Sequence, residues 1–311
     1  MQLANAIQAV RTRGLGVTLR AGLNLAEAAF HRAVLGRHFL ERPIHDYKML
    51  LDLDDPGISR TLILFGQREM EHKVMLERVL RPGMTVLDIG ANIGYYALME
   101  LALIAPGGRL IAVEPSPANV ELLKRNLALN GRAGVEVHQA AVSDTIGKRS
   151  FFLSQMSNLN TFHVEATVHL SGKRIDVQTT TVPALMKGRP LDLMRMDVEG
   201  HEVEVINGLL PAVEAGTLAP MIIFETHRNR YSAEHDLERP LRRLFALGYR
   251  TRLAGSSSQR GTALIEARGY KGSAPILTDD VTRVIFEHIS ADDTVDFICR
   301  SGGLRTVLLA R

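Results

Sequence analysis

The chain has 311 residues, 46% of them hydrophobic and 23% charged, with a formal net charge of +3 at pH 7. These values exclude a disordered chain, and the charge is too small to indicate a nucleic-acid partner by itself. A single cysteine, Cys299, excludes an internal disulfide, and no run of about 18 uncharged apolar residues predicts a membrane-spanning helix, so we expect a protein of the reducing cytoplasm.

The N-terminal forty residues differ in composition from the rest of the chain. Up to Gly22 their charged side chains are all arginines. Apolar residues recur at helical spacing, namely Leu3, Ile7 and Val10, then Ala26, Phe30, Ala33 and Val34. We predict a helical extension over residues 1–50, ahead of one domain over residues 51–311. The extension either lies on the inner face of a membrane as a basic amphipathic helix, or packs on the domain or on a second subunit of a homodimer.

Residues 84–89 are an apolar run that contains Asp88, and a turn with Gly90 and Gly94 follows. This order is typical of a buried parallel strand that leads into a helix beside a ligand. The Gly-x-x-x-Gly spacing lacks the extra glycine with which dinucleotide-binding turns approach a pyrophosphate. Asp88 would repel phosphates, but its carboxylate suits a ligand that carries an ammonium group and a sulfonium.

A second apolar run, residues 109–114, ends at Glu114, which lies 20 residues after Gly94. From that position a carboxylate can accept hydrogen bonds from both hydroxyls of a ribose. Pro115 restricts Glu114 to extended geometry, which directs the carboxylate towards the loop. S-adenosylmethionine meets these demands better than NAD, and we expect Asn92 to contact its methionine part.

Strands and helices alternate through the rest of the domain, as in a doubly wound parallel sheet. Further strands are predicted at 135–142, 191–197, 220–226, 248–254 and 304–310, and helices near 93–104, 116–129, 202–215 and 234–246. This gives a seven-stranded, mostly parallel sheet with helices on both faces.

Two insertions interrupt this alternation. The first, at about 145–190, reads as a hairpin-like lobe. The second, at about 255–303, looks helical over 280–301. Since the sixth strand should run parallel to its neighbours, the second insertion would leave from the ligand-binding edge of the sheet. It is therefore expected to be a lid, with a dimerisation element as the alternative.

The candidate catalytic residues end the fourth and fifth strands. Asp197 lies at the topological switch point of the sheet. Alternatively it could cap the following helix, where Glu199 and Glu202 would interact favourably with the positive N-terminal end. His227 has an ordinary pKa suited to deprotonating a hydroxyl, and Glu225 beside it could bind substrate or accept the proton. His201 is expected to face solvent at the start of a helix.

From about Leu53 to Thr226 the chain resembles the FkbM family of S-adenosylmethionine-dependent methyltransferases. The resemblance is carried by five motifs in order: Val86–Tyr96, Glu114–Pro117, Asn126–Gly131, Ala140–Asp144 and Met196–Glu202. It implies an α/β class I methyltransferase (Rossmann-like) fold. The implied cofactor-binding residues are Asp88, Gly90, Asn92, Gly94, Glu114, Pro115, Ser143 and Asp197. Ser143 falls where such enzymes hold the adenine edge. Glu69 matches an acid ahead of the domain, but Arg68 stands where many relatives carry an aromatic residue.

The resemblance also implies O-methylation, with a hydroxyl of a sugar, glycan, lipid-linked saccharide or polyketide as acceptor. The sequence has no Asn/Asp-Pro-Pro-aromatic segment of the kind that holds a planar nitrogen, which argues against amino acceptors. It also has no basic-aromatic track for nucleic acid. The 11 histidines show no His-x-x-x-His spacing, so no metal is expected. The alternatives are a nitrogen methyltransferase, a nucleotide-dependent oxidoreductase, and a non-catalytic cofactor-binding or scaffold protein with the same fold.

Overall fold

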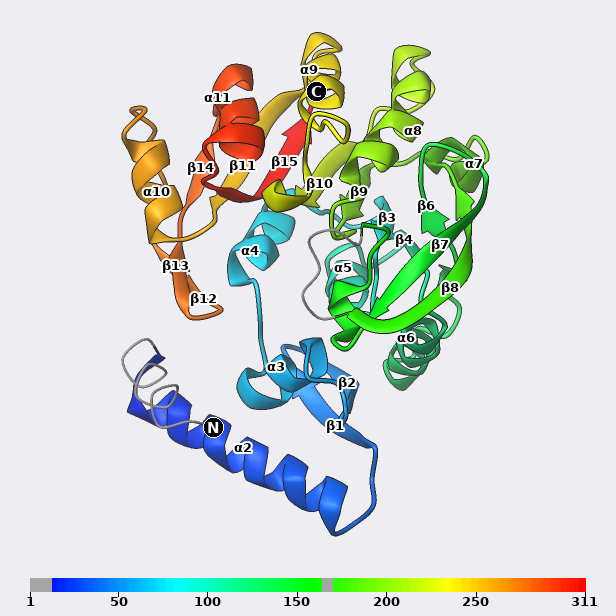
Figure 1. Cartoon of the computed structure of the whole chain (residues 1–311), viewed down its shortest axis with the longest axis vertical. Coiled ribbons are helices and arrows are strands. Elements are labelled where there is room, and N and C mark those ends of the chain that lie inside the picture. The colour runs from blue at the N-terminus through cyan, green and yellow to red at the C-terminus, as the bar shows by residue number, and fades with distance from the viewer. Residues whose placement is uncertain (1–12, 164–169) are drawn as a thin grey trace.

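The computed structural model describes residues 13–163 and 170–311, so the predicted periodic positions Leu3, Ile7 and Val10 lie outside them. Its centre is an eight-stranded sheet in the order β14-β11-β15-β10-β9-β3-β4-β5 (Figure 1). Five strands run parallel: β3 Thr85–Ile89, β4 Arg109–Val113, β5 Glu136–His138, β9 Leu193–Met196 and β10 Met221–Glu225. The expected mostly parallel α/β sheet is confirmed, with eight strands instead of seven.

Both faces of the sheet are covered, which is why its strands are continuous apolar runs. Successive residues of a strand point to opposite faces, so Leu87 and Ile111 join one core while Val86 and Leu110 join the other. The first core includes side chains of α7 Val182–Met186, α8 Glu202–Glu214 and α9 Glu238–Ala246. The second includes those of α3 Ile58–Phe65, α4 Met70–Val79, α5 Tyr95–Leu103 and α6 Pro117–Leu129.

The sixth predicted strand, β11 Arg250–Ser256, does not run parallel to its neighbours. It pairs antiparallel with both β15 Leu304–Ala310 and β14 Ile285–Glu287, so that expectation is wrong. β15 is itself antiparallel to β10, and two reversals return β11 to the direction of β10. Its carboxyl end therefore does lie at the same edge of the sheet as the ends of the parallel strands.

The second insertion is part of the core. It contains α10 Gln259–Glu266, β12 Ile276–Thr278, β13 Val281–Arg283, the sheet strand β14, and a helical segment made of α11 Ala291–Val295 and the π turn Asp296–Arg300. Helix was expected over 280–301, which is wrong for its first part. Phe286 and Phe297 are buried in the core, so this segment does not have the loose packing expected of a lid.

The first insertion is the predicted hairpin-like lobe. β7 Gly147–Ser154 and β8 Leu170–Thr180 pair antiparallel, and β6 Ala141–Val142 completes a small three-stranded sheet. The predicted strand 135–142 is thus divided, because β5 stays in the central sheet while β6 joins the lobe. The short 3-10 helix Ser157–Leu159 also belongs to this insertion.

Within the described part of the expected extension, α2 Leu15–Ala33 is helical. Residues 39–50, expected to belong to this helical extension, instead form most of a hairpin of β1 Phe39–Ile44 and β2 Tyr47–Asp52. Met49 and Leu51, two residues apart, are both fully buried, which is the periodicity of a strand. None of the described helices combines the length and apolar character needed to cross a bilayer.

Candidate active site

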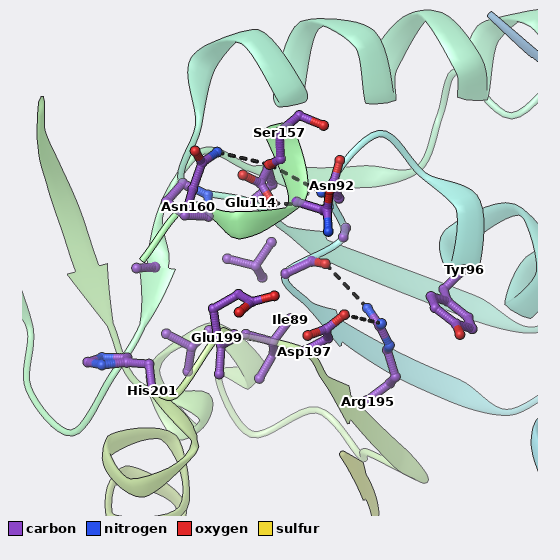
Figure 2. Close-up of a pocket in the computed structure, with 18 of the residues that line it drawn as sticks. Ile89, Asn92, Tyr96, Glu114, Ser157, Asn160, Arg195, Asp197, Glu199 and His201 are labelled. Atoms are coloured by element: carbon purple, nitrogen blue, oxygen red, sulfur yellow. Dashed lines mark hydrogen bonds and ion pairs between the residues drawn. The ribbon is translucent and has the colours of Figure 1, made fainter. Parts of the chain in front are cut away.

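A cavity of about 750 Å³ opens where β3, β4 and β9 end (Figure 2). Figure 2 shows Asn92 and Glu114 on one side and Asp197 and Glu199 on the other. Between them the wall is largely apolar and is formed by Ile89, Val113, Ala140, Ala141, Val142, Phe151 and Phe162. No residue of the insertion 255–303 lines this cavity, so the predicted lid is not there. The lobe contributes Ser157 and Phe162 instead.

The glycine turn after β3 forms the floor of the cavity. Gly90 has a φ of 77°, and a Cβ there would clash with the carbonyl oxygen of Asp197. Only glycine therefore lets this turn pack against the end of β9. Gly94 has a φ of 95° and lies against Leu123, but it heads α5 and does not line the cavity.

Glu114 is buried at the cavity wall and accepts three hydrogen bonds. The donors are the backbone amides of Asn92 at 3.0 Å and Ser116 at 2.9 Å and the side-chain amide of Asn119 at 3.2 Å. Burial raises the pKa of Glu114 to about 7, although these bonds oppose the shift. A carboxylate has about four acceptor positions, so Glu114 keeps one for a ligand, on the Oε2 side. Pro115 lines the cavity beside it.

Asp88 lies behind the cavity wall and is not among its lining residues. Its carboxylate is fully buried, with Oδ1 3.0 Å from Nη1 of Arg195. The other guanidinium nitrogen, Nη2, lies 3.3 Å from Oδ2 of Asp197, and the group stacks over the Tyr96 ring at 4.1 Å. The structure therefore gives Asp88 a protein partner in place of the expected ligand contact, and Arg195 links it to Asp197.

Ser143 is also set back from the cavity. Its hydroxyl lies 3.0 Å from Nε2 of His201 and accepts a hydrogen bond from Arg149 at 3.2 Å. Residues 140–142 and Phe162 line the cavity instead. His201, expected in solvent, is 1% exposed and its ring stacks on Phe162 at 4.5 Å, so that expectation is wrong. Burial lowers the pKa of His201 to about 4.

A second cavity, of about 660 Å³, meets the first. The two share Arg68, Asn158, Asp197 and Glu199 as lining residues. The other residues of the second cavity are mostly polar or charged, namely Leu159, Glu225, His227, Asn229, Arg230 and Arg305. The three predicted catalytic residues therefore come together at this boundary, with Asp197 in both cavities.

His227 is surrounded by carboxylates. Its Nδ1 lies 2.8 Å from Glu202, while Nε2 lies 3.2 Å from Glu225, 3.6 Å from Glu199 and 3.8 Å from Asp197. Burial alone would lower the pKa of His227, but these acids outweigh it and raise the pKa well above its usual value. The ordinary pKa expected for His227 is therefore wrong, and the raised pKa favours the positively charged imidazolium form. Its part in catalysis stays a prediction.

The carboxylates differ in their charge balance. Burial and the neighbouring Glu225 raise the pKa of Asp197 to about 6, despite Arg195. Burial also raises the pKa of Glu199 to about 7. Glu225 pairs with Arg305 and His227, which outweigh its burial and lower its pKa. The carboxyl groups of Asp197 and Glu199 therefore each gain or lose a proton near neutral pH, whereas the lowered pKa of Glu225 favours its ionised form.

Asp197, Glu225 and His227 bring three donor atoms within 4.8 Å of one another, which is a set that could hold a metal ion. Positive charge is already present there, because Arg195 pairs with Asp197 and Arg305 with Glu225, and His227 is protonated. These cations oppose a metal ion at this place.

The sequence interpretation missed Arg195, Arg305 and the position of Glu199. A charged residue inside an apolar strand such as Leu193–Met196 is costly without partners, and that is the signal that could have found Arg195. The same holds for Arg305 in β15. Glu69 serves in two ways, because it precedes α4 and its carboxylate lines the first cavity, where it accepts a hydrogen bond from the Tyr96 hydroxyl at 2.6 Å.

Comparison with known proteins identifies the family of this chain. The family model described as the methyltransferase FkbM domain matches residues 88–251. The chain belongs to the FkbM methyltransferase family. The expected family is thereby confirmed, and with it a methyltransferase domain of the S-adenosylmethionine-dependent kind.

Individual relatives match over shorter stretches. Methyltransferase sdnD of Sordaria araneosa is 30% identical over 158 residues, which are 40% of this chain and 60% of that protein. The 31-O-demethyl-FK506 methyltransferase FkbM of Streptomyces tacrolimicus is 40% identical over 88 residues, 28% of this chain and 33% of that protein. A solved S-adenosylmethionine-dependent O-methyltransferase of Thermotoga maritima is 10% identical with a TM-score of 0.40, covering 88% of this chain and 84% of its own. The chain thus spans at most about 60% of the curated relatives named here.

The residues of the first cavity fit this cofactor. Its apolar wall suits an adenine, and Glu114 keeps an acceptor position for a ribose hydroxyl. Oδ1 of Asn92 is a buried oxygen without a hydrogen-bond partner among the described residues. Such an oxygen can accept a hydrogen bond from the ammonium group of a methionine part.

Proposed function

We propose that the chain is an O-methyltransferase that transfers a methyl group from S-adenosylmethionine to a hydroxyl of a sugar, glycan, lipid-linked saccharide or polyketide-type acceptor. The observation that carries this proposal is the meeting of two cavities at Asp197 and Glu199. The first fits the cofactor, and the second offers a place for an acceptor. A methyl group transferred at their boundary would pass beside Asp197.

The acceptor class follows from the lining of the second cavity. It presents the carboxylates of Glu199 and Glu225, the guanidinium of Arg305 and the amide of Asn229. These groups can donate to and accept from several hydroxyls at once. A polyhydroxylated molecule suits such a lining better than a flat apolar one does.

Asp197 is best placed to take the proton of the acceptor hydroxyl. Arg195 holds its Oδ2, whereas Oδ1 lies 3.8 Å from Nε2 of His227 and has no hydrogen-bond partner in the described part of the chain, so it can accept. As the hydroxyl oxygen gains the methyl group, its proton passes to this carboxylate. A general base of this kind contributes about 10²–10⁴-fold in rate. His227, already protonated, would hold the acceptor or the neighbouring carboxylates in place.

Bound S-adenosylmethionine supplies a methyl group on a positively charged sulfur, which is already a good leaving group. The protein has mainly to hold the acceptor in line and exclude water. Correct orientation of this kind accounts for roughly 7–11 kcal/mol of the barrier in favourable systems. Phe162 and the loop at Ser157 close the lobe side of the cofactor cavity and serve that purpose.

Transfer of a labelled methyl group into a panel of acceptors tests the proposal. The panel should hold polyhydroxylated sugars, saccharide-lipids and macrolides together with amines of similar size. We expect label in one or more hydroxyl compounds and none in the amines, and calorimetry should show binding of S-adenosylmethionine but not of NAD. Transfer to amines alone would contradict the proposed acceptor class. Cofactor binding without transfer to any compound would favour a non-catalytic scaffold.

A further inference from the structure

Four side chains converge beside the first turn of α8, away from the boundary that the two cavities share. They are His163 of the lobe, His201 and Glu204 of the α8 start, and His235 of the segment before α9. Nδ1 of His201 lies 3.4 Å from Nε2 of His163 and 3.1 Å from Oε2 of Glu204. Nε2 of His235 lies 3.1 Å from the same glutamate oxygen. The donor atoms of His163, Glu204 and His235 all lie within 4.8 Å of one another.

These separations match those between the ligands of a tetrahedral metal ion. With metal–ligand bonds of about 2.0–2.1 Å, two donor atoms of a tetrahedron lie roughly 3.3–3.4 Å apart. The separations of His201 from His163, of His201 from Glu204 and of His235 from Glu204 are 3.1–3.4 Å. Imidazole nitrogens with one carboxylate oxygen are a common ligand set for Zn²⁺.

The second nitrogens of two of the rings are also held. Nδ1 of His235 lies 2.9 Å from the carbonyl oxygen of Arg230, and Nε2 of His201 lies 3.0 Å from the hydroxyl of Ser143. A metal-binding histidine generally donates its other ring N–H to such an oxygen, which fixes the tautomer and the orientation of the ring. Each of these two rings therefore directs its remaining nitrogen into the cluster.

The cluster of His163, His201, Glu204 and His235 differs in charge from the cluster of Asp197, Glu225 and His227. It contains one carboxylate and three imidazoles, with Arg230 donating only to the backbone carbonyl of His163 at 3.2 Å. Side-chain exposure is 2% for His201, 15% for Glu204 and 18% for His235, so the site is sheltered but open enough for an ion to enter.

We propose that His163, Glu204 and His235 bind one divalent metal ion beside His201, with Zn²⁺ as the preferred species. The ion joins the lobe to α8 and to the segment before α9. His201 lines the cofactor cavity, as Figure 2 shows, and its ring packs against Phe162, so the ion fixes the edge of that cavity. Its role is structural, because it ties these three segments together.

The proposal departs from the sequence expectation that the chain holds no metal. That expectation rests on local spacing, and here only His201 and Glu204 are close in the chain, three residues apart. The other two ligands lie 38 residues before His201 and 31 residues after Glu204. No spacing motif reveals a site assembled from three segments.

The metal content of the full-length chain tests the proposal directly. The purified protein is stripped with a chelator, equilibrated with Zn²⁺, desalted and measured by mass spectrometry of the element. We expect about one ion per chain and a lower Tm after stripping. Glu204→Gln and His235→Ala should lose the ion. Replacement by Co²⁺ should give the visible absorption of tetrahedral coordination.

Two controls keep the outcome interpretable. His138→Ala removes a histidine that pairs with a single glutamate, Glu136, and should keep the ion. Glu225→Gln should also keep it, because that residue belongs to the other cluster. A wild-type chain that retains no zinc after equilibration would overturn the proposal, as would an ion lost with Glu225→Gln but kept with His235→Ala. These readouts need neither cofactor nor methyl transfer, so they stand apart from the proposed function.

Discussion

Arg195 supplies the buried positive charge on which two carboxylates of the site depend. It lies in β9 with its side chain 2% exposed, between Asp88 and Asp197. A guanidinium is suited to this place because its fork of N–H groups reaches both acids and the carbonyl of Gly90, which accepts at 3.3 Å. Removal of the arginine would leave two acids in the interior without their cation.

Arg195→Leu should therefore be strongly destabilising. Loss of one partner of a buried ion pair costs about 3–5 kcal/mol, because the remaining charge stays uncompensated. Denaturant unfolding, followed by circular dichroism, measures the change. Arg189→Leu is the matched control, since its pair with Glu136 is partly exposed and should contribute only about 0–1 kcal/mol. Equal losses in the two variants would contradict the role given to Arg195.

Asp197 makes the activity depend on pH. As a base it must be ionised, and burial with the neighbouring Glu225 raises its pKa to about 6. The rate of methyl transfer should fall as the pH drops through about 6, since the protonated acid cannot accept the hydroxyl proton. Because Asp197, Glu199, Glu225 and His227 interact, the profile reports the cluster as a whole.

The check is kcat/KM measured from pH 5 to 9 in wild type and in Asp197→Asn. We expect the variant to lose about 10²–10⁴-fold in rate and, with it, the inflection near pH 6. Asp176→Asn, which removes an exposed acid of the lobe paired only with Ser150, should leave the profile unchanged. An unaltered inflection in Asp197→Asn would assign the base to another residue.

At the scale of elements, the sequence predicted those strands that are buried on both faces. β4, β9 and β10 are apolar runs with an acidic residue at or directly after their end, and β3 contains Asp88, so hydrophobic pattern and site residues lie close together there. β14 was missed because it has three residues, too few to show a period. The hairpin of β1 and β2 was missed because its apolar residues also fit a helical pattern over a short window.

The residues of the candidate site were likewise predicted only in part. Glu114, Asp197 and Glu225 could be predicted because each stands at or just beyond the end of a parallel strand. Arg195 and Arg305 are each marked by a charge inside an apolar strand, but their pairing with Asp88 and Glu225 could not be predicted, because only the fold brings those strands together. The position of Ser143 behind the cavity and the burial of His201 likewise depend on the lobe, whose packing has no signal in the local sequence.

Helix α2 carries an apolar stripe on its outer side. It buries Ala21 and Ala28, whereas five larger residues are 52–72% exposed: Leu15, Leu19, Leu23, Phe30 and Val34. Their spacing, with Val34 directly after the helix, puts them on the face opposite Ala21 and Ala28. Such a stripe fits the expected contact with a second copy of the chain or with an anionic membrane surface, and this contact stays a prediction.

Leu19→Ser with Leu23→Ser should separate stability from association. Both side chains are mostly exposed, so we expect a Tm close to that of wild type by calorimetry. Light scattering should show a smaller mass if a second copy covers the stripe, and vesicle sedimentation should show weaker binding if a membrane does. A large fall in Tm would instead place the stripe against the body of the chain.

For the molecule as a whole, the important arrangement is that one lobe and one sheet edge enclose two adjoining cavities. The sheet edge supplies the charges, and the lobe supplies Phe162 and Ser157, which cover the first cavity. The backbone carbonyl of Ser157 accepts hydrogen bonds from Asn119 at 3.1 Å and Asn92 at 3.4 Å, so the lobe is tied to the turns on which Glu114 and Gly90 lie. A ligand in this cavity therefore contacts both parts and should stabilise them together.

Thermal unfolding with and without S-adenosylmethionine tests that coupling. A ligand present at a hundred times its Kd stabilises the folded state by about 2.7 kcal/mol. For a chain of this length that corresponds to a rise in Tm of about 4 °C. Glu114→Gln should retain the fold, because the amide oxygen can still accept from Ser116 and Asn119 in the place of Oε1. It should lose most of the rise, because the NH2 group in the place of Oε2 cannot accept from a ribose hydroxyl and charge-assisted bonds of roughly 1.5–3 kcal/mol are lost. NAD at the same concentration should leave Tm unchanged. A comparable rise with NAD, or an undiminished rise in Glu114→Gln, would show that the first cavity does not recognise the ribose through Glu114.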